Sequence, residues 1–431
     1  MQAFMQEKIL PTVMKFVNTK GVTALKDGLI YTMPLTIVGS VFLLLANFPI
    51  QAVVTWLDSM SLLDPLHQAY GATFNIVALV GVMAIAYKYV TNEGYEGFSA
   101  GILGAVSLII LMSPTAINED GAMVGNVIDK TWTAGQGMIA AIIVGLTVGY
   151  IYSAFLNKGI RIKLPAGVPE GVSNAFTALI PTAAIITLMT VIYGFFYLVL
   201  DTTFIEFIYT VIQLPLQGLT DSLGGVIVAA FLTPLLWWFG VHGTVVINGI
   251  LGSLWQANAL ANQAILDQGL ELTIENGGRI VTNQFIDQFI TVTGTGLTLG
   301  LVVYLIFFAK SQQSKQLGRL GGVSGLFNIN EPILFGTPIV MNPFLAIPFI
   351  LMPVFSGVLL YFLISVGIMP LFTAVSVPWT TPPIISGFIV AGWRGALYQI
   401  VILVLSFFAY LPFIRKIDKI NYENEQAARV Q

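Results

Sequence analysis

The sequence predicts an all-α polytopic membrane protein. Of its 431 residues, 56% are hydrophobic and 9% are charged, whereas a typical soluble domain carries about 25% charged residues. Apolar runs close to 20 residues recur along the chain, which is the length that a helix needs to cross the hydrocarbon core of a bilayer. Other apolar segments contain interior prolines. We therefore expect about ten transmembrane helices, together with re-entrant hairpin segments, amphipathic helices and a small external β-hairpin.

The expected membrane-spanning helices are separated by short polar loops. In chain order they are Gly28–Asn47, Gly71–Val90, Phe98–Met112, Gln136–Leu156, Ala175–Leu200, Ser222–Phe239, Gly243–Asn258, Phe285–Ala309, Pro343–Val366 and Trp393–Phe413. Two of them, Phe98–Met112 and Gly243–Asn258, are shorter than the others. We expect each of these two to be tilted or partly re-entrant.

The first 27 residues are expected to lie at the membrane surface. Apolar residues such as Phe4, Ile9 and Val13 recur on one helical face, and Glu7 and Lys8 interrupt any continuous apolar run. This pattern predicts an interfacial amphipathic helix and not a cleavable signal peptide.

The remaining chain divides by composition. Its first part has regular apolar spans with glycines spaced for close helix contact, Gly97–Gly101 and Gly145–Gly149. In its last part, Pro, Gly, Asn and Trp interrupt the spans. The expected regions are an N-terminal amphipathic helix (1–27), a first membrane domain (28–200), an amphipathic connector (201–221), a second membrane domain (222–414) and a cytosolic tail (415–431).

The distribution of positive charge predicts the orientation. Lys and Arg concentrate in alternate loops, for example at Lys158, Arg161 and Lys163, whereas the loops between them are poor in positive charge. Because such loops lie on the cytoplasmic side, both termini are expected in the cytosol, which agrees with an even number of spans. Arg394 is the main misfit, since it falls at an outer helix end.

Two segments of the second membrane domain are apolar but cannot be long regular helices. Gly321–Asn342 and Pro370–Gly392 both contain interior prolines, which remove hydrogen bonds from a helix and clash with its backbone. Non-helical backbone at membrane depth is tolerated where it lines a cavity, so we expect re-entrant segments around a substrate; kinked helices are the alternative. In Leu270–Asn283, alternating residues flank Asn276-Gly277, which predicts a small external β-hairpin.

The carboxylate of Glu331 is the main candidate for a functional group. It lies within the first of these two segments, and a charged group at bilayer depth costs about 3 kcal/mol on insertion scales. An acid and broken backbone together indicate a binding site; a cytosolic loop with a helix-capping acid is the alternative. His242, between Gly240 and Gly243, is expected on the same side, either beside the ligand or as a structural histidine.

The residue types around these two groups suit a sugar. A sugar presents C–H groups to an aromatic face and hydroxyls to hydrogen-bonding side chains. Trp379 is a candidate for the aromatic face, and a role as an interfacial anchor is the alternative. The candidate set is Glu331, His242, Asn330, Trp379, Asn283 and Trp237.

Several classes of function are excluded or disfavoured. The chain has no cysteine and two histidines, so disulfides, thiol nucleophiles and Cys-ligated metals are excluded, and a His-rich metal site is disfavoured. With a net charge of −3, no basic surface points to nucleic acid. There is no P-loop. We therefore expect no metal, no cofactor and no nucleic-acid partner.

Two motifs resemble those of a known family. Phe327-Asn328-Ile329-Asn330-Glu331-Pro332-Ile333, with Gly336 and Pro338 after it, resembles the glutamate motif of enzyme IIC sugar permeases. These belong to the phosphoenolpyruvate-dependent phosphotransferase system, in the lactose/cellobiose/diacetylchitobiose family. Trp238-Phe239-Gly240-Val241-His242-Gly243 resembles the histidine motif of the same family.

The resemblance implies a homodimer of ten-span subunits in the bacterial cytoplasmic membrane, with the N-terminal half at the dimer interface and a β-linked disaccharide held by the C-terminal half. It also implies phosphorylation of the sugar by a phosphocysteine on a separate enzyme IIB chain. Glu331 would hydrogen-bond the hydroxyl that receives the phosphoryl group, with His242 beside the sugar and Trp379 at the matching tryptophan. Enzyme IIB is expected on a basic cytosolic face formed by Lys158, Arg161, Lys163, Lys310, Lys315 and Arg319.

Two other functions are compatible with the residues alone. A proton-coupled secondary sugar transporter would use Glu331 as its proton site, and the same acid would suit a membrane-embedded enzyme or receptor that transports nothing. Only the motif resemblance separates these from the phosphorylation-coupled permease.

Overall fold

The computed structural model describes residues 18–46, 51–117, 122–165, 167–337 and 339–430, together with residues 11 and 15. Of the expected N-terminal amphipathic helix (1–27), residues 1–10, 12–14, 16 and 17 lie outside these residues, and its last part, from Lys20, belongs to α3 (Lys20–Leu29). The chain forms two compact units. We call Thr12–Gly218 with Gly249–Ala261 the N-terminal unit, and Leu219–Asn248 with Asn262–Gln431 the C-terminal unit.

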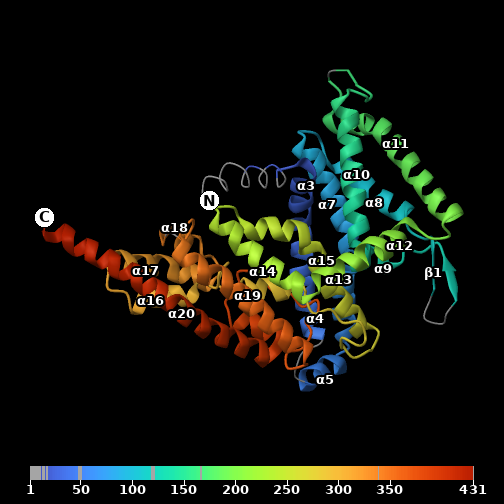
Figure 1. Cartoon of the computed structure of the whole chain (residues 1–431). Helices are drawn as coiled ribbons and strands as arrows, with labels where there is room; N and C mark the ends of the chain where they lie inside the picture. Colours follow the sequence, from blue (N-terminus) through green and yellow to red (C-terminus); the bar gives the residue numbers. More distant parts are fainter. Residues whose placement is uncertain are drawn as a thin grey trace. The chain divides into compact units, whose positions relative to one another are not determined.

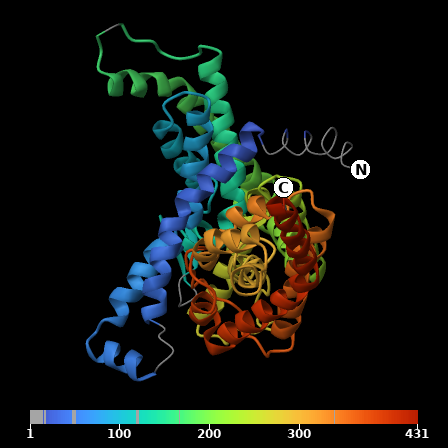
Figure 2. The ribbon, with the colours of Figure 1, turned by 90° about the vertical axis from the view of Figure 1, so that its left-hand side faces the viewer.

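The N-terminal unit is built mainly from regular helices. The helices α7, α8 and α10 lie side by side, and α3 and α11 pack against members of this group (Figure 1). In Figure 2 the blue segment that contains α4 and α6 runs as a helical hairpin. The elements are α3 (Lys20–Leu29), α4 (Met33–Ala46), α5 (Gln51–Ser59), α6 (Leu63–Phe74), α7 (Val77–Asn92), α8 (Phe98–Ile110), β1 (Thr115–Ile117), β2 (Met123–Gly125), α9 (Lys130–Thr133), α10 (Met138–Asn157), α11 (Glu170–Val199), α12 (Phe204–Ile208), a π-helix (Tyr209–Gln213) and α13 (Leu214–Thr220).

Glycines allow α7 to lie very close to its neighbours. A Cβ atom added to Gly149 of α10 would lie 2.5 Å from the Cβ of Tyr89, and one added to Gly28 of α3 would lie 2.8 Å from the Cα of Ile85. Gly145, one turn before Gly149, faces the side chain of Ile85 in the same way. The Gly145–Gly149 pair therefore serves helix contact within the chain.

The expected amphipathic connector is helical. Residues 204–220 form α12, the π-helix and α13 without interruption. The Thr203 side chain accepts a hydrogen bond from the backbone N–H of Glu206, and the Glu206 carboxylate accepts one from the N–H of Thr203. This reciprocal cap explains why the helix begins there.

The C-terminal unit contains long helices and short broken ones. Its helix α14 packs against α19, and α16 packs against α17 and α20 (Figure 1). The elements are α14 (Leu223–Trp238), α15 (Gly243–Asp267, of which Gly249–Ala261 belong to the N-terminal unit), a π-helix (Phe285–Ile290), α16 (Leu299–Phe307), α17 (Gln312–Leu326), α18 (Glu331–Gly336), α19 (Pro343–Ser365) and α20 (Ile385–Val430).

The described residues include six helices that are long and apolar enough to span a membrane, or seven if the pair Phe204–Thr220 and Leu223–Trp238, bent by 71°, is one span. The total of ten spans remains a prediction. Helix α8, with 13 residues, is as short as expected. Helix α15 continues beyond Asn258, where it was predicted to end. The residues that follow, Ala259, Leu260 and Ala261, are good helix formers.

The expected continuous span Phe285–Ala309 is wrong. It consists of the π-helix Phe285–Ile290, an irregular stretch over 291–298 and helix α16. Within the irregular stretch Gly294 and Gly296 have φ of 83° and 90°, and Thr293 and Leu297 also have positive φ. A right-handed helix cannot continue through such backbone.

The expected β-hairpin at Leu270–Asn283 is also not formed. Residues 270–283 contain a tight turn in which the N–H of Gly277 and of Gly278 donate to the carbonyls of Ile274 and Thr273, but no strands. The described strands are β1 and β2, which pair antiparallel in the N-terminal unit. The Asn-Gly signal therefore predicted a turn correctly and the flanking strands incorrectly.

The two proline-containing segments are broken, as expected. The chain leaves α17 after Leu326, forms the short helix α18 and begins α19 at Pro343. Residues 370–384 form no helix, and α20 is interrupted soon after its start by non-helical backbone at Ala391 and Gly392.

Candidate functional site

Asn328 joins three irregular stretches of the C-terminal unit. Its Oδ1 accepts a hydrogen bond from the N–H of Thr293 at 2.6 Å, and its Nδ2 donates to the carbonyls of Trp379 at 2.5 Å and Thr381 at 2.9 Å. Asn328 is buried and has φ of 63°, a conformation that asparagine adopts more easily than most residues. The sequence analysis did not include it in the site; an asparagine within an apolar, broken segment was the available signal.

Asn330, the residue before Glu331, is held in place by its side-chain amide. Its buried Nδ2 donates to the carbonyl of Thr295 at 2.7 Å and to Oγ1 of Thr298 at 3.0 Å. A Cβ on Gly294 would come within 2.3 Å of the Asn330 side chain, so this contact requires glycine there. The amide nitrogen of Asn330 is thus committed to the protein, and it orients the start of α18.

Glu331 is the first residue of α18, and Pro332 follows it in the first turn, where proline is well tolerated. The side chain is half-buried. Its Oε2 is buried and accepts no hydrogen bond from the residues that the structure describes. Buried polar atoms are nearly always hydrogen-bonded, and an orphaned one is costly. A ligand that donates a hydrogen bond to this oxygen would therefore be stabilised.

His242 is the N-cap residue of α15, which begins at Gly243. Its Nδ1 accepts a hydrogen bond from the N–H of Val245 at 3.3 Å, which assigns the proton of a neutral ring to Nε2. The imidazole packs on the indole of Trp237, with ring centroids 4.2 Å apart and an angle of 45° between the planes. His242 is thus held at the solvent-exposed N-terminus of α15 as a hydrogen-bond donor.

A hydrogen-bonded chain connects the histidine motif to the glutamate motif. Nε1 of Trp237 donates to Oγ1 of Thr244 at 3.3 Å, and the hydroxyls of Thr244 and Thr295 are 3.1 Å apart. The carbonyl of Thr295 accepts from Asn330, the residue before Glu331. The two motifs, distant in sequence, therefore share one network through the irregular stretch 291–298.

A second connection joins the histidine motif to the residues that follow α18 in the sequence. The N–H of Met341 donates to the carbonyl of Trp238 at 2.9 Å, and Nε1 of Trp238 donates to the carbonyl of Asn342 at 2.9 Å. Residues 341–342 close the glutamate segment before α19. The histidine motif is therefore bound to the glutamate segment at two places.

Trp379 and Asn283 lie in the same unit but are held differently. The indole of Trp379 is 49% exposed, and its link to the glutamate motif runs through its carbonyl to Asn328. Oδ1 of Asn283 is buried and accepts no hydrogen bond from the described residues. The hydrogen bonds described above connect Trp237 with Asn330, the residue before Glu331, whereas Asn283 and the Trp379 indole are outside that network.

Two glutamines next to Asn283 were missed by the sequence analysis. Nε2 of Gln284 donates to the carbonyls of Thr373 and Val375, and so holds the irregular segment 370–384. The Oε1 atoms of Gln284 and Gln288 are buried and accept no hydrogen bond within the described chain. The signal was a group of polar side chains within an apolar stretch: Asn283, Gln284, Asp287 and Gln288. With Asn283 and Glu331, the C-terminal unit thus holds several buried acceptors that lack a donor.

This arrangement suits a polyhydroxylated ligand. Hydroxyl groups would supply donors to the orphaned oxygens, Nε2–H of His242 would donate to a ligand oxygen, and an exposed indole would offer an apolar face. Among the residues that the structure describes, no cluster of three or more His, Asp or Glu side chains has the arrangement of a metal site.

Comparison with known proteins agrees with this chemistry. Residues 26–353 match the family model described as phosphotransferase system, EIIC. The lichenan permease IIC component of Bacillus subtilis (strain 168) is 36% identical and aligns over 98% of this chain and 94% of its own length. The cellobiose-specific EIIC component of Geobacillus stearothermophilus is also 36% identical, over 98% and 95%.

A solved structure extends the similarity to the fold. The crystal structure of ChbC, the IIC component of the N,N'-diacetylchitobiose-specific phosphotransferase system, matches with a TM-score of 0.92 and 32% identity. The match covers 98% of this chain and 99% of ChbC. The chain therefore belongs to the EIIC family of the phosphotransferase system and is a multi-pass membrane permease for a sugar.

Proposed function

We propose that this permease binds a β-linked disaccharide of the cellobiose, diacetylchitobiose or lactose class and translocates it while a phosphorylated enzyme IIB modifies it. The similarity to cellobiose and diacetylchitobiose components supports this substrate class. The observation that carries the proposal is the buried Oε2 of Glu331, which has no hydrogen-bond donor in the described chain. A sugar hydroxyl is a donor of the required kind.

Glu331 would orient the attacking hydroxyl and accept its proton. In the transfer step the sugar oxygen forms a bond to phosphorus, the bond between phosphorus and the cysteine sulfur of enzyme IIB breaks, and the hydroxyl proton passes to the Glu331 carboxylate. Phosphoryl transfer depends chiefly on positioning and electrostatic stabilisation, and a carboxylate within hydrogen-bond reach provides both orientation and a base. The sequence has no cysteine, so the phosphocysteine must come from the partner.

The other candidate residues would act around Glu331. His242 would donate from Nε2 to a sugar oxygen, and Trp237 would hold the imidazole in place through their ring contact. Asn330 would position Glu331, because its amide is bound to Thr295 and Thr298. Trp379 would stack on a sugar ring, and Asn283 would accept a hydrogen bond from a hydroxyl through its orphaned Oδ1.

We further propose the assembly and location. The protein would lie in the bacterial cytoplasmic membrane with both termini in the cytosol, as the distribution of Lys and Arg predicts. It would act as a homodimer formed through the N-terminal unit. Enzyme IIB would dock beside the sugar-binding unit, where Lys310, Lys315 and Arg319 supply positive charge at the start of α17.

Proton-coupled secondary transport is not supported. The acid in a broken segment suits both mechanisms, but the family model and the relatives are components of the phosphotransferase system. Uptake coupled to phosphorylation is therefore the mechanism that we propose.

The test uses purified protein in proteoliposomes with phosphorylated enzyme IIB and radiolabelled cellobiose, diacetylchitobiose and lactose. Glu331→Gln keeps the side-chain shape but removes the charge. We expect it to lower the rate of sugar phosphorylation by about 100-fold or more, the usual contribution of a positioned acid or base. Sugar binding should weaken, because one acceptor becomes a donor.

The matched control is Glu423→Gln, which changes an exposed glutamate of the C-terminal helix. It should phosphorylate sugar at the wild-type rate. A wild-type rate in Glu331→Gln would refute the role of Glu331. Accumulation of unphosphorylated sugar driven by a proton gradient would refute the coupling itself.

A further inference from the structure

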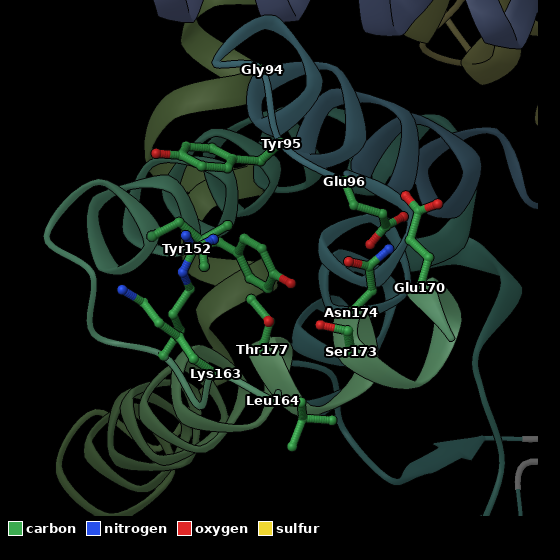
Figure 3. Close-up of a pocket in the computed structure, with 12 residues that line it drawn as sticks. Gly94, Tyr95, Glu96, Tyr152, Lys163, Leu164, Glu170, Ser173, Asn174 and Thr177 are labelled. Carbon is green, nitrogen blue, oxygen red and sulfur yellow. The ribbon is translucent and has the colours of Figure 1, made fainter. Parts of the chain in front are cut away.

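A polar cavity lies in the N-terminal unit, and none of its lining residues is among those assigned to sugar binding. Its volume is about 390 Å³, within the range of small-molecule sites. Its lining includes Glu96, Tyr152, Arg161, Lys163, Glu170 and Thr177, and Figure 3 draws the lining residues as sticks. We call it the interfacial pocket, for the position described next.

The interfacial pocket lies where two membrane-spanning helices end. The span Gly135–Asn157 finishes beside it, and the span Glu170–Val199 begins beside it. The ends of such spans lie at the depth of the lipid headgroups. The intervening loop contains Lys158, Arg161 and Lys163, and this positive charge predicts the cytoplasmic leaflet.

Charges of opposite sign line the pocket. In Figure 3 Lys163 lies at one end and Glu96 and Glu170 lie at the other, with Tyr152 and Thr177 between them. Arg161 adds a second cation to the lining. Two cations and two carboxylates sum to no net charge, so the lining is matched to a ligand that itself carries both signs.

Arg161 has a hydrogen-bonding group that the described chain does not satisfy. Its Nε is buried and has no hydrogen-bond partner among the described residues. A buried guanidinium N–H favours an anionic oxygen, and the planar guanidinium matches phosphate geometry. At the acidic end, the Glu96 carboxylate already accepts from the N–H of Phe98 and from Oγ of Ser99. Glu170 is exposed in the first turn of α11, and its carboxylate is therefore the one that can pair with a cationic group of a ligand.

The surroundings of the pocket are apolar and exposed. Large hydrophobic residues that neighbour the lining residues in sequence, in the loop and in the first turns of α11, are exposed: Ile160 is 44% exposed, Ile162 36%, Val172 44% and Phe176 42%. A soluble ligand would gain nothing from these residues. Acyl chains of a bilayer lipid would cover them.

We propose that the interfacial pocket binds the headgroup of phosphatidylethanolamine. The phosphate would lie against Arg161 and Lys163, the ammonium against Glu170, and the acyl chains along the exposed apolar residues. A primary ammonium donates hydrogen bonds to a carboxylate, which a quaternary choline cannot do. An anionic headgroup such as phosphatidylglycerol would leave Glu170 without a cation and would be repelled by it.

The test measures lipid retention by native mass spectrometry on the full-length protein in detergent, supplied in turn with phosphatidylethanolamine, phosphatidylcholine and phosphatidylglycerol. The wild type should retain phosphatidylethanolamine in preference to the other two. Arg161→Gln should weaken this retention by about tenfold, because a charge-assisted hydrogen bond is lost. Lys163→Gln is a second variant, which removes the other cation of the pocket lining. Glu170→Gln should shift the preference toward phosphatidylglycerol.

The matched control is Lys158→Gln, which removes a positive charge from the same loop but not from the pocket lining. It should retain lipid as the wild type does, and unchanged melting curves would show that each variant is folded. Equal retention of the three lipids by the wild type would overturn the proposal. So would equally tight binding of soluble glycerophosphoethanolamine, or of inorganic phosphate, since the ligand would then not be a lipid.

A further outcome separates lipid from protein partner. Suppose that Arg161→Gln keeps its phosphatidylethanolamine but loses sugar phosphorylation by enzyme IIB. Then Arg161 belongs to the interface with enzyme IIB, and the lipid proposal is wrong. The lipid measurement needs neither sugar nor enzyme IIB, so its failure leaves the proposed permease mechanism unaffected.

Discussion

The two units accommodate buried backbone in different ways. In the N-terminal unit α3, α7 and α10 are regular, and they approach one another closely where Gly28 and Gly149 leave room. Its helices satisfy their own backbone groups, so little buried polar structure is needed. In the C-terminal unit the helices break, and side-chain amides replace the missing helical hydrogen bonds.

Gln399 shows this replacement most fully. Its Oε1 accepts from the N–H groups of Ile384 and Gly387, and its Nε2 donates to the carbonyl of Gln288 at 2.7 Å. Asn328 does the same for the irregular stretches 291–298 and 370–384, because it bonds backbone groups of Thr293 and Trp379. Among the described residues, the N-terminal unit uses such an amide at Gln213, which donates to the carbonyl of Gly135 and accepts from the N–H of Ile139, whereas the C-terminal unit uses Asn328, Gln284 and Gln399. Broken backbone that side chains satisfy is therefore more extensive in the unit that is proposed to hold the sugar, where polar groups must face a ligand.

The largest expected effect comes from Asn328→Ala. It removes three hydrogen bonds and places alanine at positive φ. Each buried partner left unpaired costs about 1–3 kcal/mol, so we expect a total loss of about 3 kcal/mol or more. Thermal melting in detergent and equilibrium sugar binding should both fall. Asn424→Ala, on the exposed surface of α20, should change neither; unaltered melting of Asn328→Ala would break the comparison.

Gly149→Ala tests the N-terminal unit. The added Cβ would lie 2.5 Å from the Cβ of Tyr89, and overpacking of this kind costs about 1–3 kcal/mol. Melting should fall, whereas the sugar affinity of the folded protein should stay the same. The control is Gly194→Ala, where the new Cβ meets nothing within 4 Å; it should be neutral or slightly stabilising. Equal effects of the two substitutions would contradict close packing at Gly149.

Thr244→Val tests the link between the two motifs. It removes the hydroxyl that accepts from Trp237 and lies 3.1 Å from that of Thr295. A lost hydrogen bond is worth about 1 kcal/mol, and we expect sugar affinity to fall by about three- to tenfold. Thr244→Ser, which keeps the hydroxyl, should bind sugar like the wild type. If valine and serine behave alike in a radioligand binding assay, the hydroxyl network does not contribute.

The smallest effect should come from Lys20→Gln in the N-terminal unit. Lys20 pairs with Glu93 at 2.7 Å, but 66% of its side chain is exposed. Exposed ion pairs contribute little to stability. We expect the melting midpoint to be unchanged within error. A drop as large as that of Asn328→Ala would show that both units depend on polar contacts equally.

Local sequence patterns were sufficient to predict the membrane class and the positions of the most regular helices. Hydrophobicity over about 20 residues is a local property, so the expected Gln136–Leu156 and Pro343–Val366 agree closely with the spans Gly135–Asn157 and Pro343–Ser365. Proline acts locally as well, which is why the breaks within Gly321–Asn342 and Pro370–Gly392 were predictable. The family followed from the motifs around Glu331 and His242.

Long-range packing sets where the remaining helix break lies and how the two motifs meet. Residues 291–298 resemble a span in composition, and glycine is common in membrane helices. Their helix is broken because Gly294 and Gly296 lie against the side chains of Asn330 and Phe349, with no room for a Cβ at either glycine. Such contacts join residues far apart in sequence, and no local pattern specifies them. The network that places His242 and Glu331 in one unit therefore arises from packing.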